Sequence, residues 1–181
     1  MNETLTTIHQ RRSVRKFKQV PPNKDIIEDL LNAGRSAPSA INKQPWRFYV
    51  ITNTALITSM AKEIEAVAEG QFQLSHGVHL SRTEDAVFHG APVVVFISAP
   101  KDNEWAELDI GMCAQNMMLA AKSLGLDSCP VGFGRFVEKT KCYSSLNVPA
   151  SERIVVSLVF GYGNEQPKEH PRKRDNVVYV S

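Results

Sequence analysis

The feature that constrains this chain most is a long helical stretch, residues 103–124, that is apolar around most of its circumference. Gly125 follows it, in the position where helices commonly end. A helix that is apolar on nearly every face has to be buried on most of them. A chain of 181 residues makes about one compact domain, which is small for burying such a helix completely. The stretch therefore predicts a subunit interface in addition to the protomer core.

The remaining segments alternate irregularly between helical and strand patterns, so a regular βαβ winding is not indicated. Helices are predicted over residues 3–10, over 24–34 with Asn23 as N-cap, and to about Gly70 with Thr54 as N-cap. Strands are predicted over residues 46–52, 92–98, 128–131, 154–162 and 177–180. Residues 71–90 are polar and contain histidine, and we expect them to form a mobile cover. No repeat or linker divides the chain, so we interpret residues 1–181 as one α+β domain.

Sequence features also limit the compartment. The longest apolar run, residues 91–97, is far shorter than the roughly 18 residues that a membrane span needs. The first five residues lack the basic and apolar regions of a secretory signal. Cys113, Cys129 and Cys142 are odd in number and form no Cys-x-x-Cys pair, which indicates free thiols in a reducing compartment. We therefore expect a cytoplasmic protein.

Motifs of several enzyme classes are missing. Two Gly-x-Gly pairs, at 132–134 and 161–163, follow predicted strands but lack the third glycine and the helix of a dinucleotide fingerprint. The sequence contains no P-loop, no Gly-x-Ser-x-Gly elbow and no His-Glu-x-x-His. His76 and His79 have no third ligand near them in sequence, so we expect no metal site. Catalysis is then expected to belong to a bound cofactor, with no catalytic side chain.

Positive charge is concentrated near the two ends. Residues 11–18 carry five cations and no acid, and residues 168–174 carry four cations and one acid. These nine leave 12 of the 21 cations for the rest of the chain, against 18 of the 19 acids. A mildly acidic body with two basic patches predicts a local anion site if the ends meet. The alternative is a basic-armed nucleic-acid or regulatory module, which the single aromatic residue of the first patch, Phe17, does not favour.

Three segments contain the candidate binding residues. Arg11-Arg12-Ser13-x-Arg15 offers guanidinium groups and a hydroxyl, which suit a phosphate, and residues 171–174 belong to the second basic patch. Small and amide residues between Pro38 and Pro45 predict a rigid loop that presents hydrogen-bonding groups. A tight helix-to-strand connection is the alternative for that loop.

In this order, the motifs resemble those of the FMN-dependent nitroreductase family, over essentially the whole chain. The resemblance rests on four segments: Arg11-Arg12-Ser13-x-Arg15-x-Phe17; Pro38-Ser39-x-x-Asn42-x-Gln44-Pro45-Trp46; Asp109–Pro130 with its Gln115-Asn116, Leu124-Gly125-Leu126 and Cys129-Pro130; and Pro171-Arg172-x-Arg174. It implies a largely antiparallel central sheet flanked by helices. It also implies a homodimer that binds FMN at the subunit interface and exchanges its C-terminal strands.

The resemblance also assigns roles to individual residues. The FMN phosphate and ribityl chain would be held by Arg11, Arg12, Ser13, Arg15, Arg172 and Arg174. The flavin of the other subunit would be contacted by Pro38, Ser39, Ala40 and Asn42. The isoalloxazine edge would lie at Val131, Gly132 and Phe133, where a backbone N–H can donate to N5 and glycine permits close approach.

The implied activity is hydride transfer from NAD(P)H through flavin N5 to an acceptor such as a nitroaromatic or quinone. The alternative within the same family is a divergent FMN chemistry, either reductive dehalogenation or flavin degradation. Neither reading involves nucleic acid or a membrane.

Overall fold

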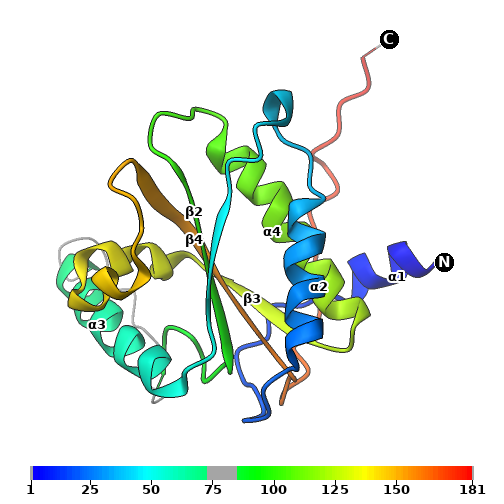
Figure 1. The fold of residues 1–181 in the computed structure, drawn as a ribbon. Helices are drawn as coiled ribbons and strands as arrows, with labels where there is room; N and C mark the ends of the chain where they lie inside the picture. The colour runs from blue at the N-terminus through cyan, green and yellow to red at the C-terminus, as the bar shows by residue number, and fades with distance from the viewer. Residues whose placement is uncertain (1, 73–84, 181) are drawn as a thin grey trace.

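The computed structural model describes residues 2–72 and 85–180 (Figure 1). Its centre is an antiparallel sheet in which four strands follow the order β1-β2-β4-β3. In that order the strands are Arg47–Ile51, Val93–Pro100, Glu152–Gly161 and Asp127–Val131. The predicted α+β class with a largely antiparallel sheet is confirmed.

Helices cover both faces of the sheet (Figure 1). One face carries α3 (Thr54–Phe72) and the 3-10 helices η2 (Gly132–Lys139) and η3 (Lys141–Leu146). The other carries α2 (Lys24–Arg35) and α4 (Ala106–Ser123), and α1 (Glu3–Gln10) packs against α4. A last short 3-10 helix is η1 (Ala40–Asn42). Among the described helices, none is long and apolar enough to cross a membrane.

The central strand β2 divides the core into two parts. Val93, Val95 and Ile97 belong to the cluster under α2 and α4, whereas Val94 and Phe96 belong to the cluster under α3. This follows from the alternation of side chains across a strand. Because both faces of β2 are buried, its sequence is apolar except for the buried Ser98 and does not alternate with polar residues.

Asparagine side chains cap three helices. Asn23 accepts a hydrogen bond from the N–H of Ile26 over 2.8 Å, which confirms the predicted start of α2. The cap of α3 is Asn53, which accepts from the N–H of Leu56 over 3.1 Å. The prediction of Thr54 as that cap was therefore wrong by one residue. Asn2 caps α1 in the same way.

The long helix α4 is partly covered by its own chain. It begins at Ala106, later than the predicted residue 103, because the Asn103 side chain accepts from the Trp105 N–H in a preceding turn. Cys113 and Met117 are fully buried against the sheet and α2, but Leu108 is 57% exposed. Some of the apolar surface of this helix thus stays uncovered in one chain, as its sequence predicts.

Residues 85–90 do not form the predicted mobile cover. The Asp85 carboxylate accepts from the N–H groups of Val87, Phe88 and Gly90, which fixes a compact turn. Phe88 is fully buried and meets the ring of Phe96 edge-on, with centroids 5.8 Å apart. Hydrophobic burial therefore holds this part in the core. Residues 73–84 of the expected cover lie outside the described residues.

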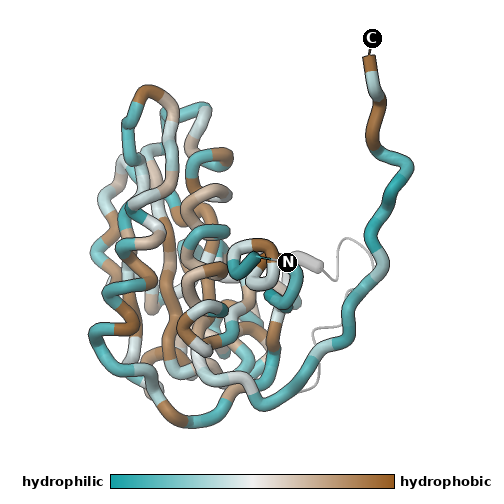
Figure 2. Tube along the Cα trace, turned by 90° about the vertical axis from the view of Figure 1, so that its right-hand side faces the viewer, coloured by the Kyte–Doolittle hydropathy of each residue, from teal (hydrophilic) through white to brown (hydrophobic). Residues whose placement is uncertain are grey.

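The C-terminal arm, residues 164–180, leaves the body of the molecule as an extended segment (Figure 2). The predicted strand at 177–180 is not formed, because no other described strand of this chain pairs with it. Its residues Val178, Tyr179 and Val180 are 86–93% exposed. An apolar segment this exposed needs a surface that its own fold does not provide.

Candidate functional site

The first basic patch lies along the outer edge of β3. Ser13 forms a parallel bridge with Ser128, and the Val14 N–H donates to the carbonyl oxygen of Ser128 over 3.1 Å. Val14 and Phe17 are buried in the core under α3, so they anchor the segment. Arg15, which lies between these two anchors, is exposed. Local sequence order thus keeps the apolar residues inside and the charged ones accessible.

The arginines of this patch differ in their contacts. The Arg12 guanidinium donates to the carbonyl oxygen of Arg11 over 2.9 Å and pairs with Glu169 at 3.3 Å. In the described parts of the chain, the side chains of Arg11 and Arg15 form no ion pair. Beside Ser13, two guanidinium groups are therefore available to an anion.

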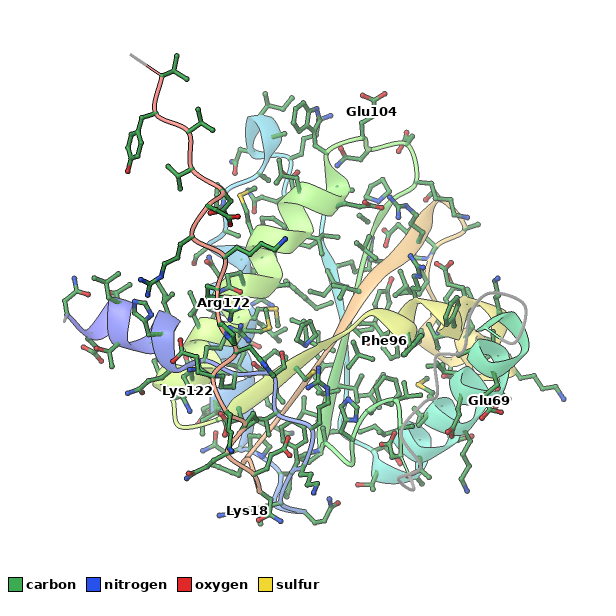
Figure 3. All side chains as sticks on the ribbon, turned by 180° about the vertical axis from the view of Figure 1, so that it is seen from behind. Lys18, Glu69, Phe96, Glu104, Lys122 and Arg172 are labelled. Carbon is green, nitrogen blue, oxygen red and sulfur yellow. The ribbon has the colours of Figure 1, made fainter. Side chains whose placement is uncertain are left out.

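The beginning of the C-terminal arm lies against the same patch. The Lys18 N–H donates to the carbonyl oxygen of Tyr162 over 2.8 Å, and the Asn164 N–H donates to that of Lys16 over 2.8 Å. Figure 3 labels Lys18 near this crossing. The first patch and the beginning of the arm therefore meet, and a meeting of the two ends was the condition that the charge distribution set for an anion site.

Two acidic residues of the arm were not predicted as site residues. Glu165 accepts from the backbone N–H of Arg15 over 2.5 Å, and Glu169 pairs with Arg12. Glu169 is the single acid of the second basic patch, which is a weak signal in the sequence. Glu165 lies outside both patches and gave no signal.

Two clefts flank the first basic patch. The larger, of about 1000 Å³, lies between the patch and the arm and is lined by Arg12, Lys18 and Glu169 among others. The second, of about 520 Å³, lies toward α3 and is lined by Arg15 and His89 among others. Burial lowers the pKa of His89, with a smaller lowering contribution from Arg15, so its imidazole favours the neutral form.

β3 leads from the basic patch to the second predicted group, Val131, Gly132 and Phe133. The strand advances about 10 Å from Ser128, beside Ser13, to Val131. Gly132 is exposed, and a Cβ atom on it would meet nothing within 4 Å. The backbone at the end of β3 is therefore open to a flat ring.

An apolar pocket of about 380 Å³ adjoins Gly132. It is lined by Phe133, Phe136 and Val155 together with Arg135, and the two phenylalanine rings stack with centroids 6.1 Å apart. An aromatic pocket next to an open backbone suits a planar ligand.

Each of the three thiols favours its neutral form. Burial raises the pKa of Cys113 to about 12. Burial also raises the pKa of Cys129, although Arg15 and Ser13 act in the opposite direction. The pKa of Cys142 is raised because its thiol donates to Glu63 over 2.8 Å. Thiols held in the neutral form are poor nucleophiles.

The loop that contains Pro38, Ser39, Ala40 and Asn42 lies at the opposite end of the molecule from the basic patch (Figure 1). It leaves the C-terminus of α2 and forms η1 before β1 begins. One chain therefore does not bring this loop together with the basic patch.

The second basic patch lies on the arm. Arg172, which Figure 3 labels, and Arg174 are both exposed. In the described parts of the chain, Arg172 and Arg174 form no ion pair. Within the described residues, contacts between the arm and the first patch thus run from Asn164 to Glu169, which pairs with Arg12.

A metal site was not expected from the sequence, and the structure can be searched for one in residues 2–72 and 85–180. The described residues contain no cluster of three or more His, Cys, Asp or Glu side chains that could hold an ion. His76 and His79 lie outside the described residues.

Comparison with known proteins identifies the family. Residues 8–162 match the sequence profile of the Nitroreductase family. The chain belongs to the nitroreductase family. The whole chain also superposes on the crystal structure of a nitroreductase with bound FMN from Bacteroides fragilis, with a TM-score of 0.86, 29% identity and complete coverage of both chains. The fold and family predicted from the motifs are confirmed.

Two curated relatives show the range of this family. A 4-nitrobenzoate reductase of Pseudomonas putida is 29% identical over 193 positions, which cover 87% of this chain and 84% of the relative. An iodotyrosine deiodinase of Thermotoga neapolitana is 26% identical over 178 positions, which cover 94% of each chain. This chain is therefore similar both to a nitroreductase and to a protein named for deiodination.

Proposed function

We propose that this nitroreductase is a homodimeric FMN oxidoreductase that moves a hydride from NAD(P)H to a nitroaromatic or quinone. The observation that carries the proposal is the pairing of Ser13 with Ser128. It joins a basic segment to a strand whose far end opens at Gly132. The FMN-bound relative from Bacteroides fragilis supports the same assignment.

The residues fit the two ends of an FMN molecule. Arg11, Ser13 and Arg15 offer donors for the phosphate, and Arg12 lies beside them. The advance of about 10 Å along β3 leaves room for the ribityl chain between the phosphate and the ring. The exposed backbone of Gly132, between Val131 and Phe133, would then meet the isoalloxazine edge.

The loop from Pro38 to Asn42 would complete the site of the other subunit. It lies far from the basic patch of its own chain (Figure 1), so it reaches a flavin only across an interface. Exposed apolar side chains favour such an interface, among them Leu5 and Ile8 on α1 and Leu108 on α4. The exposed residues 177–180 would pair with the partner, and Arg172 and Arg174 would join the phosphate site on assembly.

When bound, FMN supplies hydride transfer between the nicotinamide donor and the acceptor. The chain positions the reactants. Backbone donors at Val131 and Gly132 would stabilise negative charge at the ring edge, and the cations near Ser13 would retain the phosphate. The aromatic pocket beside Gly132 would hold a planar reactant over the ring. We assign no catalytic side chain, and we place the enzyme in the cytoplasm because its three cysteines are free thiols.

Anaerobic half-reactions test this function. FMN-loaded protein is mixed first with NADH or NADPH and then with 4-nitrobenzoate or a benzoquinone, while flavin absorbance is followed. We expect one nucleotide to bleach the flavin and each acceptor to restore it. Flavin that neither nucleotide bleaches would contradict the proposal.

Reductive dehalogenation is the second candidate, and the similarity to an iodotyrosine deiodinase supports it. The same reduced protein is mixed with diiodotyrosine, and released iodide is measured. Iodide release with no turnover of the nitroaromatic would favour the second candidate over the first.

A further inference from the structure

Asp109 is a buried carboxylate on α4 for which the FMN site described above has no use. It is 1% exposed, and its Oδ1 accepts a hydrogen bond from the N–H of Ala40 over 3.1 Å. Its Oδ2 is also buried and has no hydrogen-bond partner among the described residues. A buried carboxylate oxygen without a donor destabilises a fold, so packing alone does not explain an aspartate at this position.

A second polar side chain of α4 contacts the segment that precedes Ala40. Asn116 follows Asp109 by seven positions, about two helical turns, and its side chain donates to the carbonyl oxygen of Ala33 over 3.2 Å. Between these two contacts, α2 approaches α4 so closely that a Cβ on Gly34 would lie 2.9 Å from Met117 Cγ. Asn116 and Asp109 of α4 thus form hydrogen bonds to the backbone before and after the C-terminus of α2.

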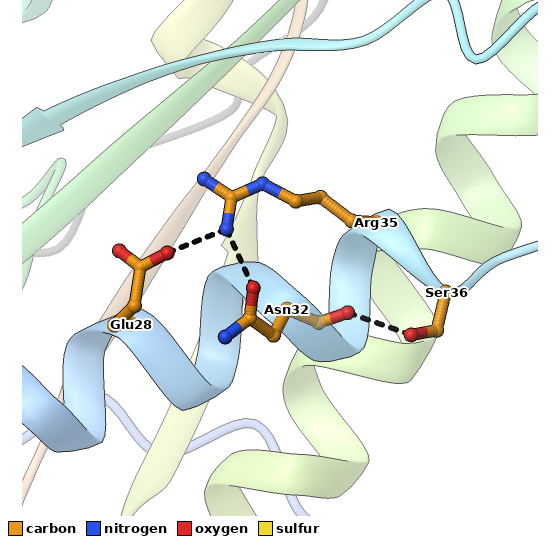
Figure 4. Close-up of polar contacts among 4 residues, drawn as sticks. All are labelled: Glu28, Asn32, Arg35 and Ser36. Carbon is orange, nitrogen blue, oxygen red and sulfur yellow. Dashed lines mark hydrogen bonds and ion pairs between the residues drawn. The ribbon is translucent and has the colours of Figure 1, made fainter.

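The C-terminus of α2 is fixed by its own side chains as well (Figure 4). Arg35 donates to Glu28 over 2.5 Å and to Asn32 over 2.6 Å, and the Ser36 hydroxyl donates to the carbonyl oxygen of Asn32 over 2.8 Å. The loop therefore starts from a rigid base, and the contact with Asp109 comes immediately before its tip.

The tip of the loop has an unfavourable backbone conformation. Ile41, Asn42 and Gln44 have φ values of 46°, 56° and 46°, in the left-handed region. This region is least favourable for a β-branched residue, and the Ile41 side chain is 87% exposed, so its own burial does not compensate. The conformation has to be imposed by contacts at the base, of which Asp109 provides one and the Ser39 hydroxyl, accepting from the Gln44 N–H over 2.9 Å, another.

We propose that Asp109 is a positioning residue, whose carboxylate fixes the loop that presents Ser39 and Asn42 to FMN bound by the partner subunit. This inference rests on the proposed function for the role of the loop. The hydrogen bond between Asp109 and Ala40 does not depend on the proposed function, so the bond and the function can be tested separately.

The first test uses the protein without FMN. Trypsin cleaves after Lys43, which is exposed at the tip of the loop. Local opening exposes such bonds in proportion to its equilibrium population. We expect Asp109→Ala to accelerate cleavage between Lys43 and Gln44 about tenfold, as loss of one charge-assisted hydrogen bond predicts. The matched control is Glu107→Ala, which removes an exposed carboxylate from the same turn of α4, where it pairs with Arg153.

The second test measures the dissociation constant of FMN below the melting temperature of each variant. We expect Asp109→Ala to weaken binding about tenfold and Asp109→Asn, which keeps an acceptor for Ala40, to stay within about threefold of the parent. Should Asp109→Ala fail to fold, Ala40→Pro removes the donor instead. Ser39 already has the extended conformation that a residue before proline requires.

The outcomes separate the two proposals. Parent protein that binds no FMN would overturn the proposed function. The trypsin result would still decide whether Asp109 fixes the loop. The positioning role would be overturned if Asp109→Ala kept both the FMN affinity and the cleavage rate of the parent. Parent-like FMN affinity in Ala40→Pro would overturn it as well. Equal losses in Asp109→Asn and Asp109→Ala would also overturn it, because the bond to Ala40 would then not be the cause.

Discussion

The backbone N–H of Val14 donates to the carbonyl oxygen of Ser128 over 3.1 Å, and this bond fixes the first basic patch to the edge strand β3. The patch also covers an edge that would otherwise leave unpaired backbone groups. One contact thus protects the sheet and sets the distance between the basic patch and the open backbone at Gly132.

Replacing Arg11 and Ser13 together by alanine tests the phosphate assignment. Each side chain would lose a hydrogen bond to a charged group, so we expect FMN affinity to fall about 100-fold. Fluorescence titration of FMN measures the change. Lys62→Ala, which removes an exposed cation from α3, is the control and should keep parent affinity. Unchanged FMN affinity in the double variant would exclude these residues from the phosphate site.

Gly134→Ala tests the packing of η2 on β4. A Cβ on Gly134 would lie 2.6 Å from Ser157 Cβ, and Ser157 is fully buried, so the two elements would have to separate. We expect the free energy of unfolding to fall by about 1–3 kcal/mol, measured by urea denaturation. The control Gly70→Ala has no atom within 4 Å of the added Cβ and should stabilise α3 by up to about 1 kcal/mol. A neutral Gly134→Ala would show that η2 packs less closely than described.

His89 should make stability depend on pH. Its pKa is lowered in the folded state, so the unfolded state binds more protons below about pH 6.5. The free energy of unfolding should therefore fall as pH decreases from about 6.5, and level off below the folded pKa. His89→Asn should flatten this slope, since asparagine tolerates the φ of 59° found there. Equal slopes for parent and variant in urea titrations would refute the assignment.

Glu63→Gln should make Cys142 more reactive. The thiol donates to the Glu63 carboxylate over 2.8 Å, which raises the pKa of Cys142. Without the charge more thiolate forms, so alkylation by iodoacetamide should accelerate severalfold. Mass spectrometry of the Cys142 peptide gives the rate. Glu69→Gln, an exposed acid near the end of the same helix (Figure 3), should leave the rate unchanged. A slower reaction in Glu63→Gln would contradict this explanation.

Local patterns in the sequence predicted much of the fold. Asn23 caps α2 because its side chain accepts from the N–H three residues later, a contact that sequence spacing alone specifies. β2 was predictable because burial on both faces requires a continuous apolar run. The Asp85 turn was missed because Val87 and Phe88 form too short an apolar group to indicate a core segment.

The site was predictable in its parts and less so in its arrangement. Basic residues at both ends indicated an anion site, but nothing local revealed that Glu165 would reach the Arg15 N–H. The Asp109–Ala40 contact joins residues 69 positions apart, and its signal is only a carboxylate in an apolar helix. The segment 177–180 was predicted as a strand because its residues favour strands, yet a strand needs a neighbour. The roles of the individual site residues stay predictions.

The absorption spectrum of purified protein after FMN addition and desalting tests the central claim most directly. The account predicts flavin bands that stay with the protein at about one FMN per chain, one per basic patch on β3. Protein that retains no flavin would contradict it, and the pairing of Ser13 with Ser128 would then need another anion to explain the cations gathered there.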